Sequence, residues 1–173
     1  MAATSRGVVV KKKKQKIKKV KKSIVFFGGS GFVGSYFVKR LLQNNHKVII
    51  YDLVKPEFKD KNLKFIKGDI LDKKKISKTI KKDHIIFNFA GWADLESAPN
   101  NLADVKKLNI EGNTNILEIC EKKKVKRFVY ASTLYVFSKY GGIYKETKKK
   151  CEKIIENSKV PYTILRFGSL YGL

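Results

Sequence analysis

The residues best suited to chemistry lie between positions 132 and 148. Tyr144 and Lys148 are four residues apart at the start of a predicted helix, so their side chains share one face. A tyrosine beside an ammonium group can act as a general base, because the cation lowers the phenol pKa from about 10 toward neutrality. Ser132 and Thr133 place two hydroxyls at the end of the preceding predicted strand. Together these residues indicate proton transfer to or from a bound hydroxyl.

The Tyr-x-x-x-Lys spacing is weak evidence by itself, because lysine is so frequent in this chain. Three pairs have it: Tyr51/Lys55, Tyr135/Lys139 and Tyr144/Lys148. Tyr51 lies within a predicted strand, and Tyr135 lies just past one, where helical pairing is not expected. Only Tyr144 opens a long predicted helix downstream of the two hydroxyls, so we favour that pair.

A strand, a glycine turn and a helix near the amino end would position a ligand beside these residues. The strand is residues 24–27, and the helical pattern covers residues 32–42. Gly28 would allow the tight turn, Gly31 the close approach of a pyrophosphate, and Gly34 the packing of helix on strand. The helix N-terminus favours phosphate through its free N–H groups. The alternative is a glycine-rich turn that binds nothing.

A second predicted strand, residues 47–52, ends in Asp52. An acid about 20 residues past the glycines is placed to accept hydrogen bonds from an adenosine ribose. Its charge would repel a 2′-phosphate, which favours NAD over NADP, although the nearby Lys55 weakens that inference. The alternative is an aspartate that only caps a turn at the strand end.

Strands and helices alternate along the chain. The predicted strands are 24–27, 47–52, 63–67, 84–90, 127–131 and 162–166, and the predicted helices are 32–42, 72–82, 99–122 and 144–157. This order predicts an α/β fold: a Rossmann-type, doubly wound parallel sheet of about six strands with helices on both faces. Ligands of such sheets bind beyond the carboxyl ends of the strands, where the candidate residues lie.

Composition predicts one domain preceded by a basic arm. The chain has 173 residues and a net charge of +24, from 39 basic and 15 acidic residues. Most of the basic residues are lysines spread over the whole length, which favours solvated faces; binding of a polyanion is the alternative. Residues 1–22 carry no acid and are expected to be a disordered arm. No apolar run approaches the ~18–20 residues of a membrane span, so we expect a cytoplasmic protein.

The cysteines and histidines do not indicate a metal site. Cys120 and Cys151 both lie in helical patterns, which predicts buried thiols in a reducing compartment. His46 and His84 have no Cys or His partner at ligand spacing, so no metal is expected.

Several motifs together resemble one family. They are the glycine loop 28–34, Gly-Asp-Ile at 68–70, Asn-Phe-Ala-Gly at 88–91, the Asn-containing segment 109–115, the strand 128–133 and the segment 166–172. The chain is similar to the cofactor-binding half of the extended short-chain dehydrogenase/reductases, the NAD-dependent epimerase/dehydratase group that acts on nucleotide sugars. The similarity covers residues 22–173.

The resemblance implies a mechanism and a site. Tyr144 would be the acid/base on a sugar hydroxyl, Thr133 would bind that hydroxyl, with Ser132 the weaker candidate, and Lys148 would hold the nicotinamide ribose and lower the Tyr144 pKa. The implied cofactor-binding residues are Gly28, Ser30, Gly31, Phe32, Val33, Gly34, Asp52, Asp69, Ile70, Phe89, Ala90, Gly91, Asn109 and Lys148. It also implies NAD rather than NADP, a nucleotide-sugar substrate, and a homodimer through helices 100–121 and 144–157.

Three features depart from the family pattern. Phe137 and Ser138 replace its usual Tyr-Gly, the loop from Thr133 to Tyr144 is shorter than usual, and the chain ends at Leu173, before the family's substrate portion. The expected division is therefore an arm, residues 1–22, and an NAD(P)-binding Rossmann domain, residues 23–173. A truncated, non-catalytic dinucleotide-binding or partner-binding module is the alternative function, and nucleic-acid binding through the arm is the least favoured.

Overall fold

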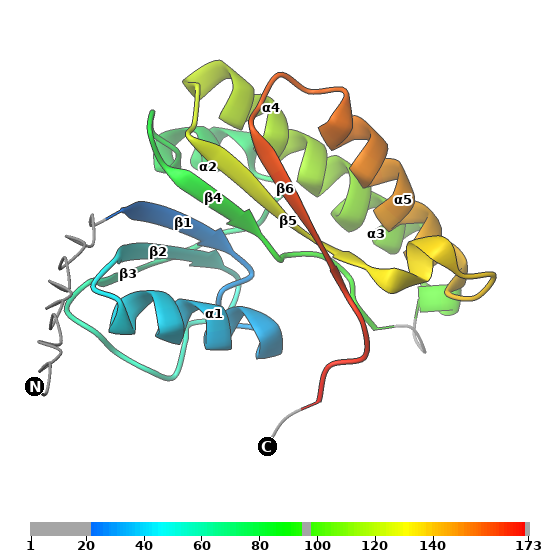
Figure 1. The fold of residues 1–173 in the computed structure, drawn as a ribbon, viewed down its shortest axis with the longest axis horizontal. Helices are drawn as coiled ribbons and strands as arrows, with labels where there is room; N and C mark the ends of the chain where they lie inside the picture. The colour runs from blue at the N-terminus through cyan, green and yellow to red at the C-terminus, as the bar shows by residue number, and fades with distance from the viewer. Residues whose placement is uncertain (1–21, 95–97, 172–173) are drawn as a thin grey trace, which may run out of the picture.

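The computed structural model describes residues 22–94 and 98–171, so the predicted arm lies outside the described part except for Lys22. A parallel sheet of six strands runs through these residues in the order β3-β2-β1-β4-β5-β6 (Figure 1). The strands are β1 Ser23–Phe27, β2 Lys47–Asp52, β3 Leu63–Lys67, β4 Ile85–Asn88, β5 Arg127–Thr133 and β6 Tyr162–Phe167. The order reverses between β1 and β4, which confirms the predicted Rossmann topology.

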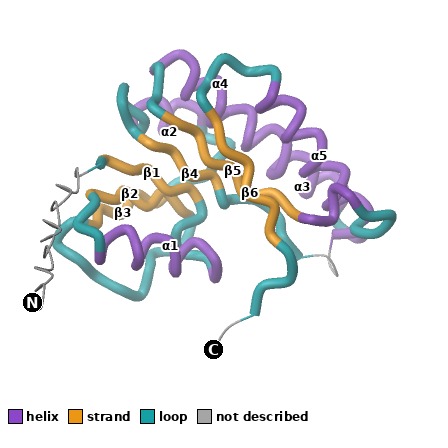
Figure 2. The backbone as a smooth tube through the Cα atoms, in the orientation of Figure 1, coloured by secondary structure: helices purple, strands orange, loops and turns teal. Residues whose placement is uncertain are grey.

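Helices cover both faces of the sheet. The α-helices are α1 Phe32–Gln43, α2 Lys73–Thr79, α3 Leu102–Lys106, α4 Asn113–Lys123 and α5 Gly142–Glu156. Figure 2 shows α1 on one face and the layer containing α2, α4 and α5 on the other. Within residues 22–94 and 98–171, no helix is both long and apolar enough to cross a bilayer.

Two apolar layers form because alternate residues of a strand point to opposite faces. In β1, Ile24 and Phe26 pack with Val38 and Leu42 of α1. Their neighbours in β1 join a larger cluster under α2, α4 and α5, which includes the two buried thiols Cys120 and Cys151. Both faces of β1 are therefore buried, which explains its uninterrupted apolar sequence.

The single helix predicted for residues 99–122 is interrupted in the structure. A short 3-10 turn η1 (Ala98–Asn100) and α3 lead into a π-helical turn, η2 (Lys107–Gly112), before α4 begins. At Gly112 the backbone passes so close to Ile70 that a side chain would overlap it. Turns of this type inside helices are frequent at functional sites, and η2 contains Asn109.

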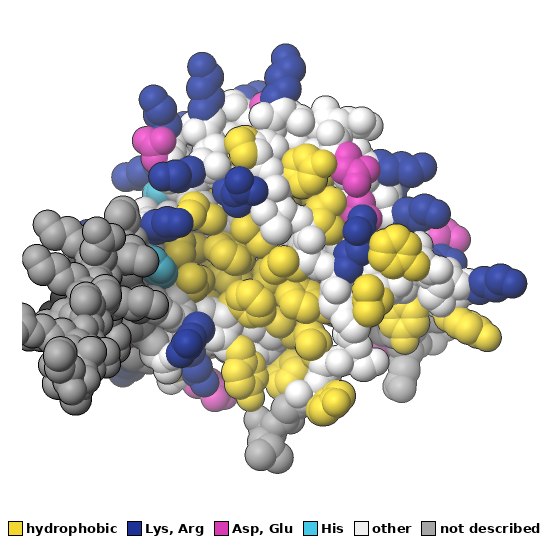
Figure 3. Space-filling view, in the orientation of Figure 1, with side chains coloured by type: hydrophobic (Ala, Val, Ile, Leu, Met, Phe, Trp, Pro, Cys, Tyr) yellow, Lys and Arg dark blue, Asp and Glu magenta, His cyan; other side chains and the backbone are white. Residues whose placement is uncertain are grey.

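Part of the sheet remains open on the α1 side. Because α1 lies over β1, β2 and β3, apolar residues of β4, β5 and β6 remain partly exposed there, among them Phe87, Leu165 and Phe167. Figure 3 shows hydrophobic side chains gathered on this face of the molecule. The ring of Phe167 contacts Phe37 and Phe89, so the open face is continuous with the packing of α1.

Candidate functional site

The glycine loop between β1 and α1 is shaped by close backbone packing. Gly28 has φ +76°, and a Cβ there would lie 2.6 Å from the backbone nitrogen of Ala90. A Cβ at Gly34 would overlap the carbonyl oxygen of Gly28. At Gly31 a Cβ would be 3.6 Å from that same oxygen, an ordinary contact. The fold itself therefore requires glycine at 28 and 34, whereas the space beside Gly31 is open.

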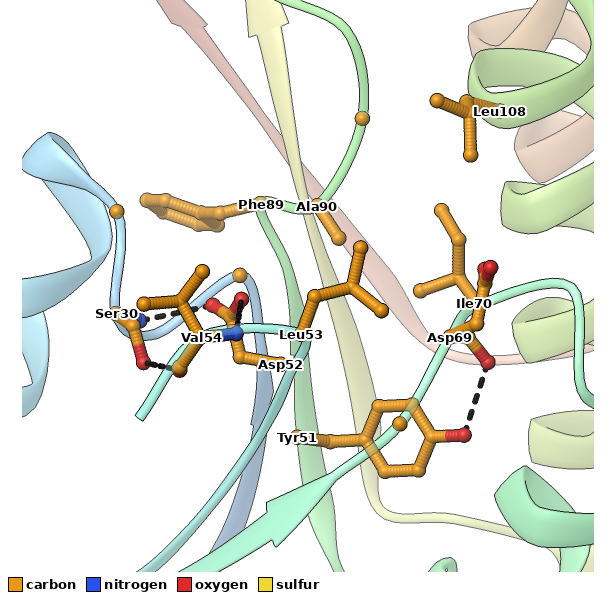
Figure 4. A pocket seen from close by; sticks show the side chains of 14 residues that line it. Ser30, Tyr51, Asp52, Leu53, Val54, Asp69, Ile70, Phe89, Ala90 and Leu108 are labelled. Atoms are coloured by element: carbon orange, nitrogen blue, oxygen red, sulfur yellow. Dashed lines mark hydrogen bonds between the residues drawn. The ribbon is translucent and has the colours of Figure 1, made fainter. Parts of the chain in front are cut away.

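The carboxylate of Asp52 lies against this loop (Figure 4). One oxygen accepts a hydrogen bond from the Ser30 N–H at 3.0 Å, and the other accepts from the Val54 N–H at 3.2 Å. The Ser30 hydroxyl donates to the Val54 carbonyl at 2.7 Å. Asp52 thus caps a turn, as the alternative interpretation held, and it also lines a cavity together with the loop.

That first cavity has a volume of about 380 Å³. The Tyr51 ring fills the space that a side chain at Gly68 would need, and the Tyr51 hydroxyl donates to the Asp69 carbonyl at 2.9 Å. Burial, assisted by Asp72 and Asp69, raises the pKa of Tyr51 to about 12, which keeps this donor protonated. The lining residues are Gly28, Ser30, Gly31, Tyr51, Asp52, Leu53, Val54, Gly68, Asp69, Ile70, Phe89, Ala90, Gly91 and Leu108.

A second cavity of about 460 Å³ lies on the other side of the glycine loop. It is lined by Gly28, Gly31, Phe32, Val33, Gly34, Phe89, Gly91, Ala93, Ala131, Ser132, Thr133, Tyr144, Lys148, Phe167, Gly168 and Leu170. The two cavities share Gly28, Gly31, Phe89 and Gly91, so they adjoin at the glycine loop, and we refer to them together as the trough. The residues singled out for proton transfer thus lie in the same trough as Asp52.

Lys148 reaches this trough from the second turn of α5. Its Nζ donates to the Ala131 carbonyl at 2.8 Å, and the residue is only 5% exposed. Burial lowers the pKa of Lys148 to about 8, against the opposing effects of Cys151 and Glu152. The ammonium form therefore prevails at neutral pH, and it has two further N–H groups for a ligand.

The electrostatics of Tyr144 differ from the prediction. Burial, followed by the nearby Tyr135, raises the pKa of Tyr144 instead of lowering it toward neutrality. The Lys148 Nζ lies over the Tyr144 ring, 5.7 Å from its centroid. For the chain by itself, loss of hydration thus outweighs the effect of the cation.

The two candidate hydroxyls at the end of β5 have different surroundings. Thr133 is 5% exposed, and its Oγ1 accepts a hydrogen bond from the Tyr135 N–H at 3.2 Å, which caps the 3-10 turn η3 (Leu134–Phe137). This bond holds Thr133 in place and leaves its O–H able to donate. Ser132 is also buried and lines the second cavity.

Asn109 lies behind the wall of the trough instead of lining it. Its Oδ1 accepts from the Trp92 N–H at 2.7 Å, and its Nδ2 donates to the Trp92 carbonyl and to Thr147 Oγ1, both at 3.1 Å. The residue is 3% exposed. Asn109 thus joins the loop after Gly91 to the helix that carries Tyr144, and its expected contact with a cofactor stays a prediction.

An ion pair ties α5 to the edge strand β6. The Arg166 guanidinium donates to both carboxylate oxygens of Glu152, at 3.0 and 2.8 Å. The Phe137 ring lies over this guanidinium, 4.9 Å away. Phe137, a departure from the family pattern, thus covers the pair that connects α5 with the end of the sheet.

Sequence reasoning missed part of the lining. Leu53 and Val54 directly follow Asp52 and are 57% and 67% exposed, which could have been inferred from their position after a strand-end acid. The other missed residues are Tyr51, Gly68 and Leu108 around the first cavity, and Ala93, Ala131, Phe167, Gly168 and Leu170 around the second. The last three come from a segment that the motifs included but to which no role was given.

The fold and the trough define a Rossmann-type α/β protein with its site at the carboxyl ends of the strands. A family model described as "NAD dependent epimerase/dehydratase family" matches residues 24–173. The chain belongs to this family.

Known proteins with similar sequence or structure support the assignment. Short-chain dehydrogenase/reductase family 42E member 1 of Homo sapiens is 34% identical over 127 residues, which is 70% of this chain and 31% of that protein. A putative UDP-glucose 4-epimerase of Methanocaldococcus jannaschii is 28% identical, over 86% of this chain and 56% of that protein. The solved structure of UDP-glucose 4-epimerase from Thermotoga maritima with UDP-glucose superposes with a TM-score of 0.78 at 25% identity, covering 87% of this chain and 56% of that one. The chain thus spans about a third to just over half of these relatives' length.

Proposed function

We propose that this chain carries the cofactor-binding part of an NAD-dependent oxidoreductase that acts on a nucleotide sugar, as an epimerase, a dehydratase or a reductase. The observation that carries the proposal is that the two cavities of the trough adjoin at the glycine loop. Asp52 lines the first cavity, and Thr133, Tyr144 and Lys148 line the second. A dinucleotide cofactor needs such an elongated site, with its phosphates at the loop between two halves.

The residues present fit NAD. Gly31 is not required to be glycine by the protein's own packing, so the open space at this position suits a ligand that approaches the backbone. The N-terminus of α1 offers N–H groups to phosphates. The Asp52 carboxylate suits a ribose diol and disfavours a 2′-phosphate. When bound, NAD supplies the hydride acceptor and donor for the reaction.

The roles of the chain's own groups follow from their surroundings. Asp52 would accept hydrogen bonds from the adenosine ribose, and Lys148 would use its two remaining N–H groups to hold the nicotinamide ribose. Thr133 would donate to the sugar hydroxyl that reacts. Tyr144 would remove and return the proton of that hydroxyl. Because burial raises the Tyr144 pKa, this tyrosine can act as a base only when positive charge approaches its hydroxyl.

Calorimetric titration of the whole chain with NAD and with NADP tests the proposal. We expect binding of NAD and weaker binding of NADP. A folded sample that binds neither ends the proposal. Assays with UDP- and GDP-sugars then decide whether the chain turns over a substrate by itself.

A second candidate is a non-catalytic module that binds a dinucleotide and a protein partner. The apolar surface of β4, β5 and β6 on the α1 side favours it, since large exposed apolar patches often mark interaction sites. Turnover of a UDP- or GDP-sugar by this chain would exclude this candidate. The homodimer through helices 100–121 and 144–157 and the cytoplasmic location stay predictions, and sedimentation of the purified chain tests the former.

A further inference from the structure

An aromatic ring lies directly under the Lys148 ammonium group. The Lys148 Nζ is 4.8 Å from the centroid of the Tyr130 ring. Tyr130 belongs to β5 and is only 1% exposed. The Phe128 ring lies nearly parallel to it, with centroids 6.4 Å apart and planes 13° apart. The Tyr130 ring is therefore buried and stacked with the ring of a neighbouring residue on the same strand.

Besides the Ala131 carbonyl and the Tyr130 ring, several groups surround the Lys148 ammonium group. They are Tyr144, Cys151 and Glu152 on α5, and Arg166 on β6 through its pairing with Glu152. Both oxygens of Glu152 accept hydrogen bonds from Arg166. The Cys151 thiol donates to the Asn109 carbonyl at 3.0 Å, and burial raises its pKa, so it stays neutral.

We propose that Tyr130 is a positioning residue for Lys148: its ring face stabilises the buried ammonium form and holds Nζ against the Ala131 carbonyl. Attraction between a cation and a ring face is strongest when the pair is removed from water, as it is at this site. Without the ring, burial would shift Lys148 toward the neutral amine. A neutral Lys148 would hold the nicotinamide ribose less well, and this consequence rests on the proposed function.

The first experiment follows the titration of Lys148 through the pH dependence of the unfolding free energy. Each protein is compared with its own Lys148→Met version, and the difference isolates the lysine. In the unchanged chain the lysine should titrate near pH 8. Tyr130→Leu should lower this midpoint by about one pH unit, whereas Tyr130→Phe, which keeps the ring, should leave it unchanged.

Phe128→Leu is the matched control, because it removes a buried ring from the same face of β5 without removing the ring under Nζ. If the Lys148 titration midpoint is the same in Tyr130→Leu, in Phe128→Leu and in the unchanged chain, the proposal is overturned. If Tyr130→Leu does not fold, phenylalanine and pentafluorophenylalanine at position 130 replace it. Fluorination reverses the charge of the ring face at similar volume, so only the fluorinated ring should lower the midpoint. No difference between these two rings overturns the proposal.

A second experiment tests whether the effect of Tyr130 on Lys148 changes the binding of the cofactor. The NAD affinity of Tyr130→Leu and of the unchanged chain is measured at about pH 6 and at about pH 7.5. The variant should bind NAD less tightly at about pH 7.5, and its affinity should approach that of the unchanged chain at about pH 6, because Lys148 is then protonated. An equal loss at both values would indicate a merely structural role and overturn the proposal. If the unchanged chain binds no NAD at either pH, the proposed function fails, while the titration of Lys148 still decides the role of Tyr130.

Discussion

A hydrogen bond of 3.0 Å joins the Asp52 carboxylate to the backbone N–H of Ser30, across 22 residues of sequence. It ties the end of β2 to the glycine loop that follows β1. The acid proposed to bind the adenosine ribose therefore also sets the conformation of the loop proposed to bind the phosphates. Changes at Asp52 should affect both halves of the trough.

Replacing Asp52 by alanine should weaken NAD binding roughly ten- to hundredfold, since hydrogen bonds to a charged group are each worth about 1.5–3 kcal/mol. The preference for NAD over NADP should shrink, because the repulsion of a 2′-phosphate is removed. Calorimetry with both cofactors measures this. Asp60→Ala is the control: it makes the same charge change in an exposed loop, where Asp60 accepts from the Asn62 N–H at 2.7 Å. Equal effects of the two substitutions would contradict a local role for Asp52.

Alanine at Gly31 and at Gly34 should have opposite consequences. Gly31→Ala should change the unfolding free energy by less than about 0.5 kcal/mol but reduce NAD affinity at least tenfold, since the added methyl occupies the open side of the loop. Gly34→Ala should lower the unfolding free energy by about 1–3 kcal/mol, because its methyl would overlap a backbone carbonyl. Urea unfolding and NAD titration distinguish the two. A Gly31→Ala chain that binds NAD normally would show that no phosphate approaches there.

Tyr144→Phe should retain NAD binding and, wherever turnover can be assayed, lower it by a factor of about 10²–10⁴, the usual contribution of a general acid or base. In the chain by itself, the Tyr144 phenolate should form only above its ordinary pKa, because burial raises that pKa. Ultraviolet difference spectra between the unchanged chain and Tyr144→Phe, recorded as a function of pH, measure the formation of this phenolate. Tyr140→Phe, at a residue that is 78% exposed, is the control for the loss of one tyrosine and should leave turnover unchanged. A Tyr144 phenolate at neutral pH without added cofactor would contradict the structure.

Lys148→Met should stabilise the chain while abolishing NAD binding. The pKa of Lys148 falls from 10.5 to about 8 on folding, a penalty of about 3 kcal/mol for the buried charge; the lost hydrogen bond from the ammonium group to Ala131 offsets about 1.5–3 kcal/mol of this. The expected net gain at pH 7 is at most about 1.5 kcal/mol in urea unfolding.

The sign of the pH dependence provides a further check on Lys148. Between pH 8 and 10.5 the unfolded chain holds the lysine proton and the folded chain does not, so the stability of the unchanged chain rises with pH in this window. The advantage of Lys148→Met should shrink accordingly. Lys149→Met, at an exposed neighbour on α5, should show neither effect. A constant difference across this window would mean that Lys148 is not desolvated.

Local patterns in the sequence were enough to predict the sheet and most of the trough. Alternating apolar strands and helices predicted the parallel sheet, and the spacing of Gly28, Gly31 and Gly34 predicted a turn of that shape. Asp52 and the Tyr144/Lys148 pair were found because strand ends and helix starts converge at one rim. These features depend on residues that are close in the sequence, within one strand or helix or the next one along the chain.

Features that depend on distant contacts and on loss of water could be established only from the folded chain. The π-helical turn that places Asn109 behind the trough arises where Gly112 meets Ile70, from a different part of the chain. The direction of the Tyr144 pKa shift depends on burial, which outweighs a cation four residues away. The spacing of residues in the sequence thus established which side chains can lie close together. Packing established how much water remains around these side chains, and because hydration stabilises the charged form, it also established their protonation state.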